Sequence, residues 1–437
     1  MKSCFLLIFI LFSNYSLLIG QWIDVNQGTD SRVSAFYVDS AINKLYVGGS
    51  FEHAGNININ NIALWDGVSW SIFGSNELFS SPGYVTSIIS FNGEIIVGGD
   101  FDSIGNEQVN NIAKWNGSNW ESIGKGFDQS VQDLIVYQGE LYACGFFAYS
   151  DTNFVECVAK WNGIYWERVA HLIGYANTFS IYQGKLIIGG SFFDQNASNL
   201  RGIIGWDGLN IDTTMGGFNN YVFKLRNIND TLIAVGSFTG SSNNPSSYIS
   251  LYFNNAWHSI GNPTGGSNWV KDVIKFHNSL YFVGYFSNPP DICRYNGVGF
   301  DSLGEALGYL ERLVEYQGRL YIGGLFNDIN GIPYKNIVIY DDMINFIADN
   351  KMESSIKFDI PNPISSTEFS SKILEACNAN TFDIQIISLL GEEIFSYLRS
   401  KKYSLRNSFN SSITPGLYLL KIVSKNNSIS FQKIIVE

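Results

Sequence analysis

Short apolar runs alternate with polar, glycine-rich segments through most of this chain, and one stretch shows the pattern clearly. In residues 85–124, apolar runs at 85–90 and 95–97 flank Asn92-Gly93, and further runs open at Ile112 and Trp120 around Asn116-Gly117. Asn-Gly pairs supply the positive φ angles that a two-residue hairpin turn requires. The stretch therefore predicts four short antiparallel strands, with tight two-residue turns after the first and third.

The same unit recurs from residue 45 to about residue 340. A glycine ends the second predicted strand of every copy, and in four copies another glycine precedes it; the seven are Gly49, Gly99, Gly145, Gly190, Gly236, Gly284 and Gly324. They are spaced 50, 46, 45, 46, 48 and 40 residues apart. Four strands in each such period are typical of a β-propeller blade, whereas solenoid repeats are usually shorter. An irregular sandwich array is the remaining alternative. We predict an all-β fold with a seven-bladed propeller over residues 21–350.

The repeat region begins part-way through a unit. Trp22-Ile23-Asp24 looks like the fourth-strand openings at 70–72 and 120–122, while the last unit, after Tyr340, has only Phe346 as a poor candidate for its fourth strand. We predict that the N-terminal strand completes the seventh blade. Closing the ring in this way would remove open sheet edges, which are sites of aggregation.

Two hairpin signatures accompany the glycines. The third and fourth strands are joined by Trp-Asp-Gly or Trp-Asn-Gly at 65–67, 115–117, 161–163 and 206–208, and Tyr-Gln-Gly recurs at 137–139, 182–184 and 316–318. With the double glycine, these residues resemble kelch-type propellers, the class that includes the central domain of galactose oxidase. The resemblance covers most of residues 22–345 and implies a fold, because kelch domains host many unrelated functions. A WD40 propeller fits less well, since Gly follows Trp-Asp at once and no Gly-His precedes it.

The N-terminus carries a short apolar segment. Met1-Lys2 precedes apolar runs at 4–12 and 17–20, and polar residues interrupt them. A membrane-spanning helix needs roughly 20 predominantly apolar residues. We therefore predict a secretory signal peptide over residues 1–20, cleaved after Gly20. No later segment is apolar enough to span a membrane, so the mature chain is expected to have no transmembrane segment.

Residues 351–437 follow another pattern, with strands expected near 382–386, 417–422 and 430–435 that predict a small Ig-like β-sandwich. The order of motifs in this segment resembles the C-terminal sorting domain of the type IX (Por) secretion system; the matching residues are Pro361, Asn362, Pro363, Gly391, Gly416, Tyr418 and Lys433. Leu390 stands where a polar residue is commoner, a minor departure. The resemblance implies contact with the type IX machinery and export across the outer membrane of a Bacteroidota-type bacterium. Release or surface anchoring would follow. The alternative is a fibronectin-like accessory module.

Charge narrows the range of partners. The chain has 27 Lys and Arg against 39 Asp and Glu, a formal net charge of −12 at pH 7. Residues 352–437 hold nine basic and eight acidic side chains, so the acidity lies in the repeats. A cationic stripe that could neutralise phosphates is missing. We predict that nucleic acid is not a partner.

Few residues of the sequence point to catalysis or metal binding. The four histidines, His53, His171, His258 and His277, fall at unrelated places in the repeats, and no hydrolase elbow, zincin or phosphate-loop motif is present. We predict no catalytic residue, cofactor or metal ligand. Of the cysteines beyond the signal, Cys144 ends a second strand and Cys157 opens a third, which suggests a disulfide between them. Cys293 reads as a small core residue.

A binding site is best sought on one face. Tight hairpins would lie on one side of the propeller, and the longer connections on the other; these connections are 51–60, 101–110, 146–154, 192–200, 238–247, 286–291 and 326–335. Rigid scaffolds commonly place binding groups on such loops. We predict a secreted or cell-surface module that binds a glycan or a surface protein near the channel mouth. The alternatives are a secreted propeller enzyme acting on carbohydrate (an oxidase, hydrolase or lyase) and a structural component of the cell surface.

Overall fold

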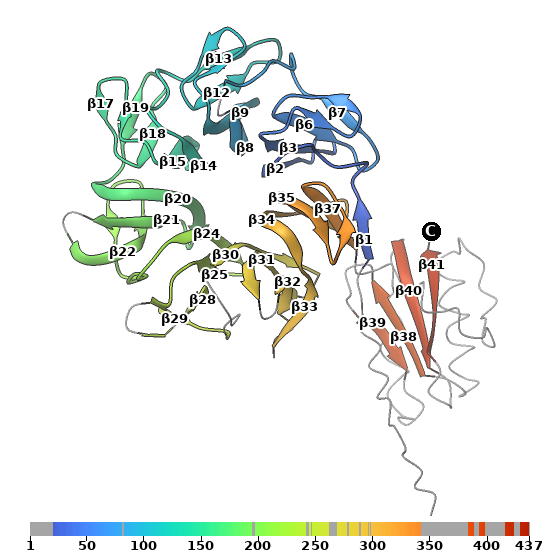
Figure 1. The fold of residues 1–437 in the computed structure, drawn as a ribbon. Helices are drawn as coiled ribbons and strands as arrows, with labels where there is room; N and C mark the ends of the chain where they lie inside the picture. Colours follow the sequence, from blue (N-terminus) through green and yellow to red (C-terminus); the bar gives the residue numbers. More distant parts are fainter. Residues whose placement is uncertain are drawn as a thin grey trace, which may run out of the picture. The chain divides into compact units, whose positions relative to one another are not determined.

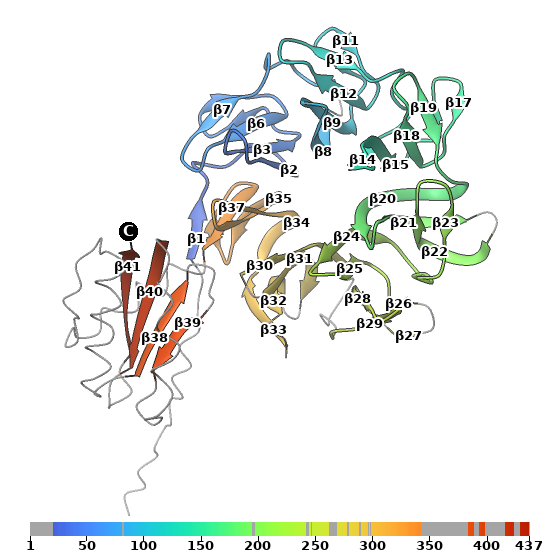
Figure 2. The ribbon, with the colours of Figure 1, turned by 180° about the vertical axis from the view of Figure 1, so that it is seen from behind.

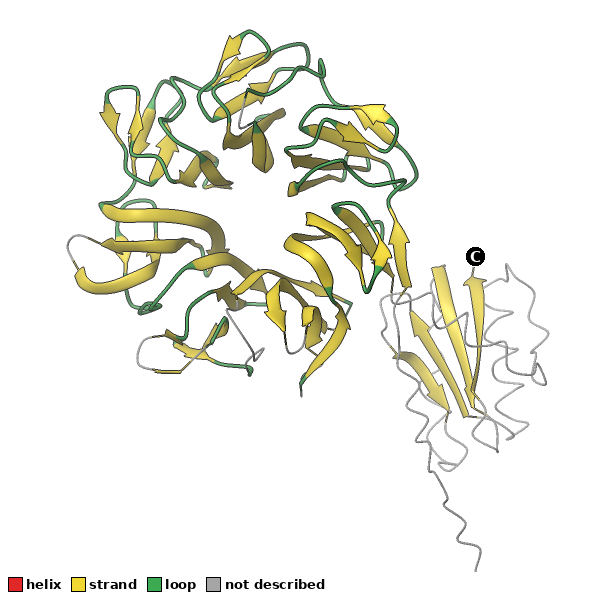
Figure 3. Ribbon diagram, viewed as in Figure 1, coloured by secondary structure: helices red, strands yellow, loops and turns green. Residues whose placement is uncertain are grey.

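The computed structural model describes residues 21–341 apart from 81–82, 195–196, 242–243, 246, 262–268, 278, 288–289, 296 and 298. It also describes four strands within 383–436. Residues 22–340 form one compact unit, and the remaining residues are grouped in a second. The predicted signal peptide lies outside the described residues. Strands and loops make up the described part of the chain, without helices (Figure 3).

Seven sheets, each with four main strands, form a ring in the first unit (Figure 1), and we call the centre of this ring the channel. Blades 1 to 3 share one order, in which strands follow the chain from the channel outward. Their strands are β2 (Val33–Asp39), β3 (Lys44–Gly49), β6 (Ile62–Trp65) and β7 (Trp70–Ile72); β8 (Tyr84–Phe91), β9 (Glu94–Asp100), β12 (Ile112–Trp115) and β13 (Trp120–Ser122); and β14 (Val131–Tyr137), β15 (Glu140–Gly145), β18 (Val158–Trp161) and β19 (Trp166–Arg168).

Blades 4 to 6 continue the ring in the same order. Their strands are β20 (Leu172–Tyr182), β21 (Lys185–Asp194), β22 (Ala197–Trp206) and β23 (Ile211–Asp212); β24 (Val222–Ile228), β25 (Thr231–Gly236), β28 (Ile249–Phe253) and β29 (Ala256–His258); and β30 (Trp269–Phe276), β31 (Ser279–Ser287), β32 (Pro290–Tyr295) and β33 (Phe300–Gly304). The predicted seven-bladed, four-stranded propeller is confirmed.

Blade 7 joins the two ends of the repeat region. Its inner strands are β34 (Ala306–Tyr316), β35 (Arg319–Ile329) and β37 (Ile337–Asp341), and its outer strand is β1 (Gln21–Asp24). The Trp22 ring lies 4.9 Å from that of Tyr340, and the Tyr334 hydroxyl donates to the Trp22 carbonyl at 3.1 Å. The N-terminal strand thus closes the ring, as predicted.

The connections between second and third strands form small hairpins that bend outward. They are β4 (His53–Ala54) with β5 (Ile57–Asn58), β10 (Ser103–Ile104) with β11 (Glu107–Gln108), β16 (Tyr149–Ser150) with β17 (Asn153–Phe154), and β26 (Gly240–Ser241) with β27 (Asn244–Pro245); β36 (Ile332–Pro333) pairs with β35. In blades 2 and 3 these hairpins pack on the outermost strands, β13 and β19. Figure 2 shows β11 and β17 at the outer rim of the ring.

The two kinds of turn within a blade differ from each other. Phe91 pairs with Glu94 across Asn92 and Gly93, which have φ angles of 51° and 82°, so the first turn has two residues as predicted. The prediction for the second turn is wrong, because Trp115 pairs with Trp120 and leaves four residues between them. There the Asn116 side chain accepts hydrogen bonds from two backbone N–H groups further along the turn, both at 2.9 Å. Asn and Asp recur at this position because their side chains cap the turn.

A β-bulge interrupts the innermost strand of every blade at the same place. One residue of that strand has no partner on the second strand; the seven bulged residues are Ser34, Thr86, Gln132, Asn177, Phe223, Lys271 and Glu311. A bulge bends its strand and redirects the neighbouring side chains. The residues at and just after the bulges therefore line the channel.

The recurring glycine faces this bulge. A Cβ atom added to Gly99 would lie 2.1 Å from the Tyr84 carbonyl oxygen, and the equivalent distance in the other six blades is 1.9 to 2.2 Å. The glycine before it packs instead against the next blade, as Gly98 does against Val131. Backbone atoms cannot move aside as a side chain can, so the second glycine is needed in all seven blades while the first is replaceable.

Apolar side chains from neighbouring blades form the core between them. One such cluster contains Trp65, Trp70 and Val33 of blade 1 with Tyr321 of blade 7. The tryptophan that opens the outermost strand also hydrogen-bonds to the preceding blade: Trp166 Nε1 donates to the Ile123 carbonyl at 3.1 Å, and Trp70 and Trp257 make equivalent bonds. The tryptophans of the repeat are thus part of the architecture.

The proposed disulfide between Cys144 and Cys157 is wrong. Cys144 pairs with Val158, one residue beyond Cys157, and both cysteines are buried free thiols. The Cys157 thiol lies 3.9 Å from the Leu172 carbonyl. Burial raises the pKa of Cys157 to about 12, so this thiol stays protonated. Cys293 is a buried core residue, as predicted.

The C-terminal unit contains one antiparallel sheet in the described residues. Its strand order is β39 (Glu393–Tyr397), β38 (Asp383–Ser388), β40 (Gly416–Val423) and β41 (Ile429–Val436). Gly416 and Tyr418 lie on β40, and Lys433 on β41 pairs with Leu419. The other predicted motif residues, Pro361, Asn362, Pro363 and Gly391, lie outside the described residues, as does the rest of the predicted sandwich.

The close contact between the recurring glycine and the bulge leads to a prediction about stability. Gly99→Ala should destabilise the propeller by about 3 kcal/mol, because its methyl group would overlap a backbone oxygen. Urea unfolding followed by tryptophan fluorescence would measure the loss. Gly299→Ala is the matched control, since a Cβ atom there meets nothing within 4 Å. Equal stability of the two variants would contradict this account of the glycine.

Candidate functional site

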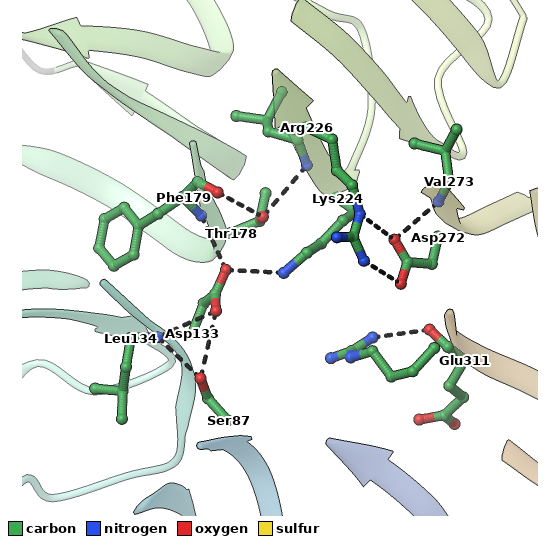
Figure 4. A network of polar contacts seen from close by, with 12 residues as sticks. Ser87, Asp133, Leu134, Thr178, Phe179, Lys224, Arg226, Asp272, Val273 and Glu311 are labelled. Atoms are coloured by element: carbon green, nitrogen blue, oxygen red, sulfur yellow. Dashed lines mark hydrogen bonds and ion pairs between the residues drawn. The ribbon is translucent and has the colours of Figure 1, made fainter. Parts of the chain in front are cut away.

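Side chains next to the bulges link neighbouring blades along the channel wall. Four of them accept a hydrogen bond from a backbone N–H of the following blade. These bonds are Leu134 N to Ser87 Oγ at 3.2 Å, Phe179 N to Asp133 Oδ2 at 3.0 Å, Leu225 N to Thr178 Oγ1 at 3.3 Å and Leu313 N to Asp272 Oδ2 at 3.0 Å. Figure 4 shows the bonds to Ser87 and Asp133. Bulged residues add further bonds, such as Ser34 Oγ to the Val85 carbonyl at 2.7 Å. Polar side chains here hold neighbouring blades in register.

Three ion pairs lie along the channel. Arg226 donates to both carboxylate oxygens of Asp272, at 3.1 and 2.9 Å, and Lys224 lies 3.1 Å from Asp133. Arg32 pairs with Glu311, which joins blade 1 to blade 7. Asp272 is 0% exposed. Its burial alone would raise its pKa, but the charge and hydrogen bonds of Arg226 outweigh that and lower the pKa. Asp272 is therefore charged at neutral pH.

Lys271 occupies the bulge of blade 6 without such a partner. Its Nζ lies 4.3 Å from the centroid of the Phe223 ring, and no carboxylate of the described residues is within ion-pair distance. Burial lowers the pKa of Lys271 to about 8. The Glu311 charge opposes this shift, and the positive charges of Arg312 and Arg32 add to it. At neutral pH Lys271 is a poorly compensated cation.

Arg312 follows the bulge of blade 7 and is also without a carboxylate partner in the described residues. Its Nη1 donates to the Glu311 carbonyl at 3.0 Å. Arg312 borders a polar cavity of about 170 Å³ in the channel, together with Ser87, Asp133, Lys224 and Arg226. A cavity of this size admits several water molecules or a small polar group.

Aromatic side chains surround the channel mouth on the face that carries the blade-to-blade connections. Tyr175, Tyr221 and Tyr309 stand just before the bulges of blades 4, 5 and 7, and Phe146 and Tyr285 directly follow the recurring glycine in blades 3 and 6. These five side chains, which we call the aromatic mouth, are 37% to 51% exposed. Two ring contacts cross between blades: Phe146 with Tyr175 at 5.0 Å and Tyr285 with Tyr309 at 6.1 Å.

The half-buried Trp269 supports one side of this mouth. It lies beside Tyr285 with ring centroids 5.2 Å apart. On blade 2, the equivalent Tyr84 donates to Asp100 at 3.0 Å. Aromatic rings fixed to the ends of sheet strands lose little conformational entropy on binding, which makes them effective contact residues.

The four histidines considered from the sequence as metal ligands lie away from the aromatic mouth. His53 bonds to Asp30 at 2.8 Å and His171 to Glu156 at 3.1 Å, while the His258 ring stacks on Phe253 and the His277 ring contacts Phe276 in a tilted arrangement. In the described part of the chain, no three His, Cys, Asp or Glu side chains group as a metal site would require. No helix found there has the length and apolarity to cross a membrane.

The predicted face is the one that carries the mouth, but the predicted loops are not what lines it. The connections at 101–110 and 146–154 turn toward the outer strands, and only Phe146 belongs to both sets. The mouth residues and the channel charges were missed because each differs from blade to blade. Aligning the copies on the second glycine, rather than on the apolar runs, would have placed them at equivalent positions.

Two family models match parts of the chain. Residues 360–437 match the secretion system C-terminal sorting domain. This match implies export by the type IX secretion system. Residues 92–117, within blade 2, match a β-propeller family described as a domain of unknown function, DUF5122. The chain is therefore a β-propeller protein that is secreted or attached to the cell surface. Neither match separates a kelch-type propeller from other kinds.

Two solved structures align with part of the chain. They are described as "Structure of U3-55K" and "Crystal structure of RRP9 WD40 repeats", with TM-scores of 0.45 each and identities of 10% and 11%. Each similarity covers 74% of this chain and 99% of the other. No curated protein matches the chain.

The lowered pKa of Lys271 leads to a prediction about the unfolding free energy of the propeller. Its pKa of about 8 in the folded protein lies below the value near 10.4 of an unfolded chain, so the charged form destabilises the fold below pH 8. Lys271→Met should therefore raise the unfolding free energy by about 1–2 kcal/mol at pH 7. The advantage should shrink as pH rises from 8 to 10, because the wild-type lysine then folds uncharged.

Denaturant titrations of both proteins at pH 7, 8.5 and 10 would measure this difference. Lys125→Met is the matched control, since Lys125 is exposed and its replacement should change stability little at any pH. A Lys271→Met variant less stable than wild type at pH 7 would contradict the stated cost of this partly buried charge.

Proposed function

We propose that this protein is a secreted binding module that holds a saccharide at the aromatic mouth. The observation that carries the proposal is the placement of exposed aromatic rings at two recurring positions, one before the bulge on blades 4, 5 and 7 and one after the glycine on blades 3 and 6. The C–H face of a sugar ring packs against an aromatic ring, while the tyrosine hydroxyls are available to its hydroxyl groups. A soluble protein rarely exposes such a group of rings without a partner.

The scaffold suits this role. The mouth residues extend from the ends of the two innermost strands, whose positions are fixed by the bulges and the glycines that face them. Binding groups on sheet strands are held more precisely than groups on loops. We include in the proposal that the blades are of the kelch type, which the glycine pairs and the Trp-Asp-Gly hairpins support. We also propose that residues 1–20 are a signal peptide, that 21–350 form the propeller and that 351–437 form the sorting domain.

Replacing mouth residues tests the proposal. Tyr285→Ala with Tyr309→Ala should weaken retention of the preferred saccharide at least tenfold, since buried aromatic contacts at interfaces are worth about 1–2 kcal/mol or more. A glycan array would identify the ligand, and calorimetry would measure the affinity. Tyr165→Ala is the matched control, because Tyr165 is similarly exposed, at 49%, but lies in the turn between β18 and β19.

Two results would contradict this assignment. One is the absence of saccharide retention by the wild-type propeller on the array. The other is an equal loss of affinity in the control and in the mouth variant, which would show that aromatic exposure alone, and not the mouth, accounts for binding.

Export gives a separate prediction. A chain truncated before residue 360 should stay inside the outer membrane, because it lacks the sorting domain. Fractionation of the producing bacterium, with protease treatment of intact cells, would locate both forms. Protease resistance of the truncated propeller in lysates serves as a control for folding. Normal surface display or release of a folded truncated chain would contradict the role of the tail.

A further inference from the structure

The charges that line the channel do not balance. Three carboxylates, Asp133, Asp272 and Glu311, are each paired with a basic side chain. Two further cations, Lys271 and Arg312, are without a carboxylate partner in the described residues. Both stand on adjoining inner strands, at and directly after the bulges of β30 and β34. The channel is thus cationic in a chain whose formal net charge is −12.

The propeller does not need a cation at the position of Lys271 for its fold. At the bulge where blade 6 has Lys271, blades 1, 2 and 4 have the neutral Ser34, Thr86 and Asn177, which bond to the next blade. Lys271 makes no such bond, and its burial disfavours its charge. A residue that weakens the fold and makes no structural bond is a candidate for function.

The cations lie below one side of the aromatic mouth. Trp269 precedes Lys271 by two residues on β30, and Tyr309 precedes Arg312 by three on β34. Strand geometry therefore separates the rings from the charges by roughly 7–10 Å along the channel. Tyr285, which contacts both Trp269 and Tyr309, joins the aromatic parts of the two blades.

We propose that the channel binds the anionic end of an acidic saccharide, with Lys271 and Arg312 holding a carboxylate or sulfate while the mouth residues of blades 6 and 7 hold the sugar. This inference rests on the proposed function and names the class of ligand. Arg312 presents a guanidinium fork suited to two oxygens, and Lys271 adds a point charge. Arg312 borders the polar cavity of about 170 Å³, which is large enough for the anionic group, while Lys271 is not part of the cavity lining and would act on the anion from its edge.

The nearby charges explain why an anion is needed to complete the site. Lys271 faces the ring of Phe223, the Arg312 and Arg32 guanidiniums and the Glu311 carboxylate, which Arg32 already neutralises. A bound anion would offset the repulsion between the three cations. It would also keep Lys271 protonated, because an opposite charge at short range favours the charged form.

Calorimetry with matched oligosaccharides tests this inference. The probes are one oligosaccharide ending in glucuronic acid, the same chain ending in glucose, and the same chain carrying a terminal sulfate ester. We expect wild-type protein at pH 7 to bind an acidic form at least tenfold more tightly than the neutral form. The glucuronate and sulfate arms distinguish the two kinds of anion.

Lysine variants test which residue causes the preference for the acidic form. Lys271→Met should abolish the preference for the acidic form and leave the affinity for the neutral form within about twofold, whereas Lys125→Met should change neither. Raising the pH from 7 to 9 should reduce the preference of wild-type protein, as free Lys271 loses its proton. The Lys271→Met variant should show no such pH dependence.

Each failure has its own signature. Equal affinity for acidic and neutral forms, both lost on Tyr285→Ala with Tyr309→Ala, would overturn the anion site and leave the saccharide site intact. A preference for the acidic form that survives Lys271→Met would overturn the role of this residue. Binding of none of the three probes would overturn both this inference and the proposed function as stated for these ligands.

Discussion

The contact between each inner-strand bulge and the glycine opposite it is the constraint on which the propeller depends. The carbonyl oxygen just before the bulge comes so near the second strand that no Cβ atom fits there. The bulge bends the strand and turns its following residues toward the axis and the next blade. Because the contact is repeated in all seven blades, the channel acquires equivalent positions that side chains can fill in different ways.

The side chains at and next to the bulges have two roles. Around blades 2 to 4, small or acidic residues such as Ser87 and Thr178 accept backbone hydrogen bonds from the next blade and so fix the register between blades. In blade 7 the equivalent position holds Arg312, and in blade 6 Lys271 stands one residue earlier, at the bulge itself; neither has a carboxylate partner in the described residues. Buried polar groups that are fully bonded stabilise a fold, and unmatched ones cost stability. Blades 6 and 7 thus combine the same register-fixing bond, from Leu313 N to Asp272, with two cations that lack a carboxylate partner in the described residues.

The sequence predicted the features that repeat and missed those that vary. Gly99 and its equivalents revealed the blades because steric exclusion admits only one residue type, and Trp22 revealed the closing strand because it opens an outermost strand like Trp120. The turn after Trp115 was misjudged, since Asn116 caps a four-residue loop with its side chain rather than by a positive φ angle. The suggested bridge between Cys144 and Cys157 failed on register, which a spacing of residues does not determine.

The sequence alone did not reveal the candidate site, for a related reason. Lys271 differs from Ser34 and Thr86 at the equivalent positions, so no residue type marks the bulge in the sequence. Its significance appears once the structure shows which cations have partners. Tyr285 and Tyr309 likewise read as ordinary strand residues until their exposure and their contact across two blades are known.

The pairing of β1 with β37 also bears on how the chain reaches its native state. Residues 25–336 separate these two strands in the sequence, so the last blade unites the earliest and the latest segments of the propeller to be synthesised. Contacts between such distant segments form slowly, and until they form a hydrogen-bonding edge stays exposed. The ring can therefore close only after β37 has been synthesised, and until then its open edge is of the kind that promotes aggregation. Because the sorting domain follows β37 in the chain, a propeller that carries it has already been synthesised with every strand it needs to close.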